Sequence, residues 1–216
     1  MLGLTASMIL FYTYSRLLQK KEIGVTELAK IIETSKPNIS QIIDSLIDLN
    51  YIENRPYKPV SLTNNGLLKA DKIYRNVLIL ESFLFKTLSM PFFQCRNEAF
   101  RWEKDVYQST IQTIKTKIDL QIGLLGDPFP TETGKMDLDN NFLNFNKTES
   151  GRPFKVWAIK NLQIIKDEYL SDISKIYLET VTAKNDTENK TVIIFQNHEK
   201  FVLPEKIVEE MLVKNI

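Results

Sequence analysis

The chain has 216 residues, of which 43% are hydrophobic and 25% are charged, and its formal net charge is +1. These values lie in the ordinary range for globular proteins, and the length suits one large domain or two to three small ones. A net charge near zero excludes a bulk electrostatic attraction to nucleic acid, although a local basic patch is enough for binding. The single cysteine, Cys95, excludes an internal disulfide and a paired-cysteine metal site.

The residue types give little support to an enzyme. The one histidine, His198, follows Asn197 in a predicted hairpin turn, where an exposed turn residue is expected. The few glycines form no phosphate-binding motif, and one Cys with one His forms no local nucleophile–base pair. We therefore expect no catalytic residues, with catalysis by carboxylates alone as a distant alternative. Polar residues spread through Met1–Leu18 argue against a signal peptide or a membrane span, so we expect a cytoplasmic protein.

The N-terminal region predicts three helices. The first covers Ser7–Lys20, and Thr26 is expected to cap the second. The third is Ser35–Asn50, in which Ser35 can cap the N-terminus and Pro37 is tolerated in the first turn. Its apolar residues recur at helical spacing and form one face: Ile39, Ile42, Ile43 and Leu46.

The opposite face of this third helix carries short and amide side chains that can contact DNA. Two helices joined by a tight turn, the second polar on its exposed face, are typical of a helix-turn-helix. The β-prone runs Tyr51–Asn54 and Val60–Thr63 follow and flank a basic tip, which predicts a wing that contacts phosphates. Basic residues also outnumber acidic ones within residues 1–75. The predicted DNA-binding residues are Ser35, Lys36, Pro37, Asn38, Ser40, Gln41, Arg55 and Lys58.

The rest of the chain predicts helices followed by short strands. Thr63 is expected to cap a helix that reaches about Ser89, and Glu98 to about Gln121 is expected to form another. The Asn-rich stretch Thr131–Gly151 predicts a linker. The expected C-terminal elements are strands at Lys155–Lys160, Tyr177–Lys184, Thr191–Gln196 and Lys200–Leu203, a helix near Asp167–Lys175 and a final helix, Glu205–Val213, that Pro204 opens.

Three groups of residues together resemble the diphtheria-toxin-repressor family, a family of metal-dependent bacterial transcription regulators. They are Ser35-x-Pro37-x-Ile39-Ser40-Gln41, a wing that ends in Ser61-Leu62-Thr63-x-x-Gly66, and Glu98-Ala99-x-Arg101-Trp102-Glu103. The similarity is nearly gap-free from Met8 to Glu103, and the order and spacing are more specific than any single motif. The resemblance implies a homodimeric repressor that binds a double-stranded, palindromic DNA operator.

Together, these patterns and the resemblance predict a mainly α-helical protein with a small β domain. We expect a winged helix-turn-helix over residues 1–63 and a helical dimerisation domain, which contains the metal-site positions, over 64–130. A linker over 131–152 would then lead to an SH3-like β-barrel over 153–216. A regulatory or stabilising role is favoured for this last domain, and peptide binding is the alternative.

The resemblance also implies sites for Mn(II) or Fe(II), and here the sequence departs from the family. Met8 and Glu103 match ligands of the primary site, and Glu81 matches a ligand of the ancillary site. The other ligand positions are substituted: Val77, Arg96 and Lys104 stand for histidines, Phe100 for Cys or Glu, and Phe11 for a carboxylate of manganese sensors.

These substitutions predict that metal is bound weakly or not at all. Phe and Val offer no lone pair, and Lys and Arg repel a cation. Our hypothesis is that Arg96 and Lys104 themselves supply the positive charge that a metal ion supplies in relatives, with Arg96 paired to Glu81 and Lys104 near Glu103 or another acceptor. The alternative is that both are solvated surface charges. Cys95 is either a replacement ligand, a redox group or, more commonly, a free core cysteine.

The sequence thus favours a DNA-binding transcription regulator, and two other functions stay open. One is a metal-responsive repressor with a remodelled metal site. The other is a winged-helix module that contacts proteins and does not bind DNA.

Overall fold

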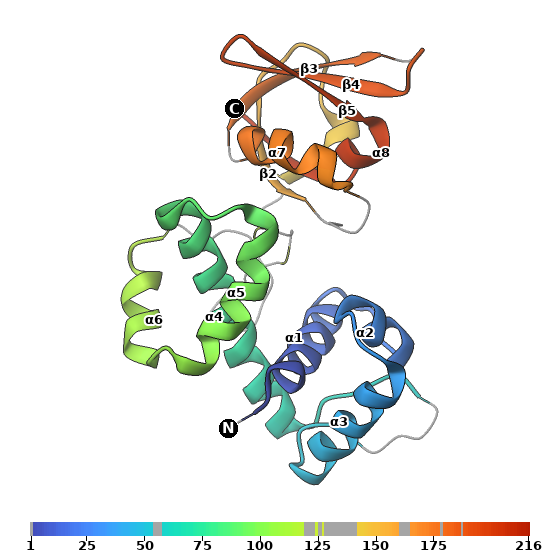
Figure 1. Ribbon diagram of the computed structural model, residues 1–216, viewed down its shortest axis with the longest axis vertical. Coiled ribbons are helices and arrows are strands. Elements are labelled where there is room, and N and C mark those ends of the chain that lie inside the picture. The colour runs from blue at the N-terminus through green and yellow to red at the C-terminus, as the bar shows by residue number, and fades with distance from the viewer. Residues whose placement is uncertain are drawn as a thin grey trace. The chain divides into compact units, whose positions relative to one another are not determined.

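The longest described helix, α4 (Asn64–Leu88), contains 25 residues. The computed structural model describes residues 2–53, 58–118, 124, 127, 142–159, 165–177, 179–186 and 188–216 (Figure 1). The chain divides into two units, one of Met1–Leu88 with Cys95–Asp119 and one of Ser89–Gln94 with Leu120–Ile216. Helices make the first unit, and an antiparallel sheet with two short helices makes most of the second, as the predicted fold class requires.

The first unit contains a helix-turn-helix whose second helix lies against the N-terminal helix, which in turn packs on α4. Besides α4, its helices are α1 (Leu4–Leu18), α2 (Val25–Ile31), α3 (Lys36–Asp48), most of α5 (Phe92–Asp105) and α6 (Gln108–Lys115). Helix α1 lies against both α3 and α4, and α2 lies against α3. The fully buried side chains of Leu10, Leu28 and Ile39 show that the core is drawn from all three N-terminal helices.

Several predicted helix boundaries are wrong in this unit. Helix α2 begins at Val25 with Gly24 as its N-cap, so Thr26 lies inside the helix and does not cap it. The single helix predicted over Glu98–Gln121 is two helices, because the chain turns at Tyr107, whose ψ of 142° is extended. No glycine or proline marks this break, which is why the pattern of apolar residues did not reveal it.

The second unit contains a six-stranded antiparallel sheet with the order β1-β6-β2-β3-β4-β5. Its elements are β1 (Phe142–Asn144), the 3-10 turn η1 (Phe145–Lys147), β2 (Phe154–Ile159), α7 (Asp167–Ile176), β3 (Thr180–Asp186), β4 (Thr191–Gln196), β5 (Glu199–Pro204), α8 (Glu205–Val208) and β6 (Met211–Asn215). The hydroxyl oxygen of Tyr177 lies 2.7 Å from the carbonyl oxygens of both Leu124 and Trp157, and the Tyr177 ring stacks on Phe92. His198 is exposed at the β4–β5 turn with a positive φ of 72°, as predicted.

Two predictions fail in this second unit. The final helix ends at Val208, and Met211–Asn215 forms β6, which pairs with both β1 and β2. Met211 and Val213 are fully buried at strand spacing, so tertiary pairing overrides the helical spacing of the local sequence. The linker was predicted over Thr131–Gly151, and the structure describes only its last part, from Phe142. There residues 142–144 form the strand β1 and not an irregular linker.

The close approach of α4 to the turn after α3 depends on Gly66. The hydroxyl of Thr63 accepts a hydrogen bond from the Gly66 N–H at 3.0 Å, which confirms Thr63 as the cap of α4. A Cβ atom at Gly66 would lie 1.8 Å from the carbonyl oxygen of Tyr51, which is far inside van der Waals contact.

Gly66→Ala should therefore lower the free energy of unfolding by roughly 1–3 kcal/mol or more, because backbone must move to admit the methyl group. Gly24→Ala is the matched control, since nothing lies within 4 Å of a Cβ atom at Gly24. Urea unfolding of the two variants measures the difference. Equal stabilities for both would show that Tyr51 does not constrain this turn.

Candidate nucleic-acid interface and regulatory site

The N-terminus of α3 is organised as the sequence predicts. The Ser35 hydroxyl accepts a hydrogen bond from the Asn38 N–H at 3.3 Å, and Pro37 lies in the first turn. Ile39, Ile43 and Leu46 are buried, so the apolar face of the helix points into the first unit. The helix is therefore held by one face, and its other face is available for contacts.

That other face carries most of the predicted DNA-binding residues. Their side chains are exposed: Ser35, Lys36, Pro37, Ser40 and Gln41. Asn38 differs, because it is half-buried and its amide donates a hydrogen bond to the Thr34 hydroxyl at 3.0 Å. Asn38 thus helps to fix the turn between α2 and α3, a local structural role that the sequence did not reveal.

The predicted wing is present in outline. Ile52 and Leu62 form an antiparallel bridge, and the Glu53 N–H donates a hydrogen bond to the Ser61 carbonyl oxygen at 2.9 Å. Lys58 is exposed between these two segments. Arg55, the other basic residue predicted at the tip, lies outside the described residues.

The positions that the resemblance assigns to metal ligands lie between α1, α4 and α5, and aromatic side chains fill much of this region. Phe11 and Phe100 are fully buried and meet edge to face, with their ring centroids 5.0 Å apart. The Tyr74 ring lies 4.8 Å from Phe11 on another side, and Val77 is also fully buried. The side chains of Phe11, Phe100 and Val77 are hydrocarbons and offer no lone pair to an ion.

The predicted ion pair between Arg96 and Glu81 is present. The Arg96 Nε donates to one carboxylate oxygen of Glu81, and Nη2 donates to the other at 3.1 Å. Only 5% of the Arg96 side chain and 0% of the Glu81 side chain are exposed, which excludes the alternative of a solvated arginine. The neighbouring Cys95 thiol is fully buried, and burial together with the Glu81 charge raises its pKa to about 12. Such a thiol stays protonated and is a poor ligand or redox group.

Lys104 does not have the predicted relation to Glu103. Among the described residues no ion pair joins the two side chains, and Glu103 instead accepts a hydrogen bond from the Asn76 amide at 3.3 Å. The cations whose charge acts on Glu103 are Lys69 and Lys72 of α4. Burial is the stronger effect and raises the pKa of the Glu103 carboxyl above its usual value of 4.5.

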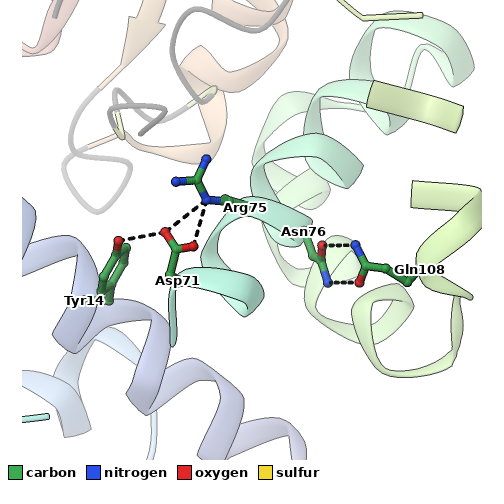
Figure 2. A network of polar contacts seen from close by, with 5 residues as sticks. All are labelled: Tyr14, Asp71, Arg75, Asn76 and Gln108. Carbon is green, nitrogen blue, oxygen red and sulfur yellow. Dashed lines mark hydrogen bonds and ion pairs between the residues drawn. The ribbon is translucent and has the colours of Figure 1, made fainter. Parts of the chain in front are cut away.

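Two polar networks on α4 were not anticipated from the sequence (Figure 2). Asn76 is buried and exchanges two hydrogen bonds with the Gln108 amide, at 3.2 and 3.3 Å, which connects α4 to α6. Asp71 accepts a hydrogen bond from the Tyr14 hydroxyl of α1 at 2.7 Å and is also held by Arg75. The sequence offered one indication of the Asn76 contact. Asn76 is a polar residue close to Ile73 and Val77 in a largely apolar stretch, where a polar side chain needs a partner.

The side chains present do not fit a divalent-metal site of the implied kind. Glu81 is already bound by Arg96, and Glu103 is hydrogen-bonded to Asn76. Within the described ranges there is no group of three His, Cys, Asp or Glu side chains that could hold an ion together. A thioether at Met8 with two separately engaged carboxylates falls short of the several convergent ligands that Mn(II) or Fe(II) requires.

Comparison with known proteins confirms the resemblance that the sequence suggested. The chain is 22% identical over 218 residues to the iron-dependent repressor IdeR of Mycobacterium leprae (strain TN), covering 91% of the chain and 92% of that protein. No family model matches the chain. Among solved structures, a manganese-dependent transcriptional repressor in complex with manganese matches with a TM-score of 0.70 and 19% identity, covering 98% of the chain and all of that structure. The IdeR structure from T. acidophilum matches with a TM-score of 0.62 and 16% identity, covering 100% and 99%. The shared fold therefore extends over the whole chain.

The raised pKa of Glu103 predicts a pH dependence of stability. Above pH 4.5 the folded protein holds the Glu103 proton more tightly than the unfolded chain does, so stability falls as the pH rises through the raised pKa. Glu103→Gln keeps an acceptor for Asn76 and removes the charge, so this fall should be absent in the variant. Urea unfolding between pH 4 and pH 8 measures how the free energy of unfolding changes with pH. Glu98→Gln, on the same helix, is the control. Parallel curves for the wild-type protein and Glu103→Gln would contradict the prediction.

Proposed function

We propose that this chain, which resembles the diphtheria-toxin-repressor family in sequence and in fold, is a DNA-binding transcription regulator, most simply a repressor. The observation that carries the proposal is the exposed polar face of α3, which Ser35 caps and which the wing follows directly in the chain. No described helix is both long and apolar enough to cross a membrane. We place the protein in the cytoplasm, where its operator would be.

The residues of α3 suit base readout in the major groove. The Gln41 amide has the donor and acceptor that a bidentate contact to adenine needs, and Pro37 can contact a thymine methyl group. Lys36 and Lys58 are exposed cations suited to phosphates, and we assign the same role to Arg55. Ser35 and Ser40 complete the face with small hydroxyl groups that allow close approach to the duplex.

A helix-turn-helix protein usually reads a two-fold operator as a dimer, and we propose a homodimer here. We place its interface in the helical region, where the large side chains of Leu88 and Tyr107 are 50% and 83% exposed. We propose the domain division expected from the sequence: winged helix over 1–63, dimerisation domain over 64–130, linker over 131–152 and SH3-like domain over 153–216.

We further propose that the regulator binds divalent metal weakly or not at all. Its relatives include repressors named for iron or manganese, but the side chains in the described part of the chain supply no donor set for such a site. A metal-responsive repressor with a remodelled site is the second candidate, because Met8 and two carboxylates occupy matching positions. A winged helix that contacts proteins alone is the third. Gel shift at two salt concentrations distinguishes this third candidate from the other two. A protein-contact module gives no DNA complex at either concentration, whereas a DNA-binding protein gives a complex that weakens steeply as the salt concentration rises.

Replacing a base-reading residue and a phosphate-binding residue should give different losses. Gln41→Ala should cost roughly 1–3 kcal/mol on the best duplex selected from a randomised pool and almost nothing on random duplex. Lys36→Ala should weaken binding to both duplexes alike and reduce the slope of log K against log salt by about 0.9 for each protomer, or about 1.8 for the proposed dimer. Fluorescence anisotropy with the two duplexes measures each loss.

The control is Gln196→Ala, which removes the same side chain from strand β4 of the second unit and should leave both affinities unchanged. Equal losses on selected and random duplex for Gln41→Ala would remove Gln41 from base readout. Failure of the wild-type protein to bind any duplex at low salt would contradict the proposed function itself.

A further inference from the structure

Arg96 is placed unlike the other paired arginines described in this chain. Its guanidinium is bound along one edge by both oxygens of Glu81, and its Cζ atom lies 4.7 Å from the centroid of the Phe11 ring. These three residues come from α5, α4 and α1. By contrast, the side chain of Arg101, which pairs with Glu98 on the same helix α5, is 69% exposed.

A charge in this environment must be fully paired to be tolerated. An isolated buried cation or carboxylate costs several kcal/mol, and the cost is offset only by close pairing with good geometry. Glu81 supplies the opposite charge, and the π face of Phe11 supplies a further favourable surface for the cation. The protonated Cys95 thiol adds no charge nearby. The guanidinium therefore fixes α1, α4 and α5 relative to one another, because moving any of these helices would expose or unpair a buried charge.

We infer that the guanidinium of Arg96 is a built-in cation that takes the structural place of a regulatory metal ion. The inference rests on the proposed function and adds its regulation: the arrangement of helices that binds DNA is assembled without a divalent ion. Arg96 is thus a positioning residue that acts on α3 through α1. Helix α1 is the element that contacts both α3 and α4.

The surroundings of Arg96 exclude a metal ion from the same place. Val77 lies one helical turn before Glu81 on α4, so its side chain projects on the same face, and it is fully buried. Both oxygens of Glu81 are bound by the guanidinium. An ion would have to displace a positive charge that is held by two hydrogen bonds and an aromatic ring. Added Mn(II) should therefore leave the wild-type protein unchanged.

The double variant Val77→His/Arg96→His tests this inference by offering two imidazoles beside Glu81 in place of the guanidinium. With Mn(II) at about 100 times its dissociation constant, the melting temperature of the variant should rise by roughly 5–10 °C, and EDTA should reverse the rise. The wild-type protein and the matched control Arg101→His should show no rise. A rise in the wild-type protein equal to that of the double variant would overturn the inference.

A second variant keeps the inference testable if the first does not fold. Glu81→Leu/Arg96→Met removes both charges together and leaves no unpaired charge in the core. It should fold by circular dichroism but bind the selected duplex at least ~10-fold more weakly than the wild-type protein, with or without Mn(II). An unchanged affinity would show that the ion pair does not position the DNA-binding helices, and would overturn the inference.

The two proposals fail in different ways. If the wild-type protein binds no duplex DNA, the proposed function is wrong, and the melting temperatures still decide whether Arg96 excludes the ion. If the wild-type protein binds the selected duplex only with Mn(II), the function stands and the built-in cation is wrong.

Discussion

A buried positive charge requires a buried negative charge beside it, and this constraint organises the helical unit. Arg96 and Glu81 satisfy it across α5 and α4, and the Phe11 ring extends the contact to α1. A hydrophobic core tolerates small shifts between helices, whereas a bidentate ion pair in the same core tolerates few, because its energy depends strongly on geometry. The helices that carry and support the helix-turn-helix are thereby held in one arrangement. Glu81 and Arg96 are thus better understood as determinants of geometry than as sources of net stability.

Polar contacts along α4 support the same arrangement from both sides. Asp71 holds α1 through the Tyr14 hydroxyl, and Asn76 holds α6 through the Gln108 amide (Figure 2). Burial, together with the bond to Asp71, raises the pKa of the Tyr14 hydroxyl, so this group stays a hydrogen-bond donor throughout the physiological range. Here the contacts are made by side chains of the chain itself.

Local chemistry explains which features could be predicted from the sequence. Ser35 with Pro37, Thr63 and the Asn197–His198 turn were predicted correctly because a cap or a hairpin turn depends on a few adjacent residues. The break at Tyr107 was missed because no glycine or proline marks it. The strand Met211–Asn215 was missed because its pairing with β1 and β2 overrides the helical spacing of the local sequence. The Arg96–Glu81 pair was predicted only because the resemblance placed both residues at one site. The same reasoning placed Lys104 near Glu103 or another acceptor, but among the described residues no ion pair joins Lys104 to Glu103, which accepts a hydrogen bond from Asn76. The assignment of base-reading residues, of the dimer and of the domain boundaries stays a prediction.

If Arg96 holds the DNA-binding arrangement in place, the protein needs no divalent ion to bind its operator. We would measure the affinity of the wild-type protein for its selected duplex after exhaustive treatment with EDTA and compare it with the affinity in Mn(II) or Fe(II). We expect equal dissociation constants in the two conditions. A loss of binding in EDTA that Mn(II) or Fe(II) restores would contradict it.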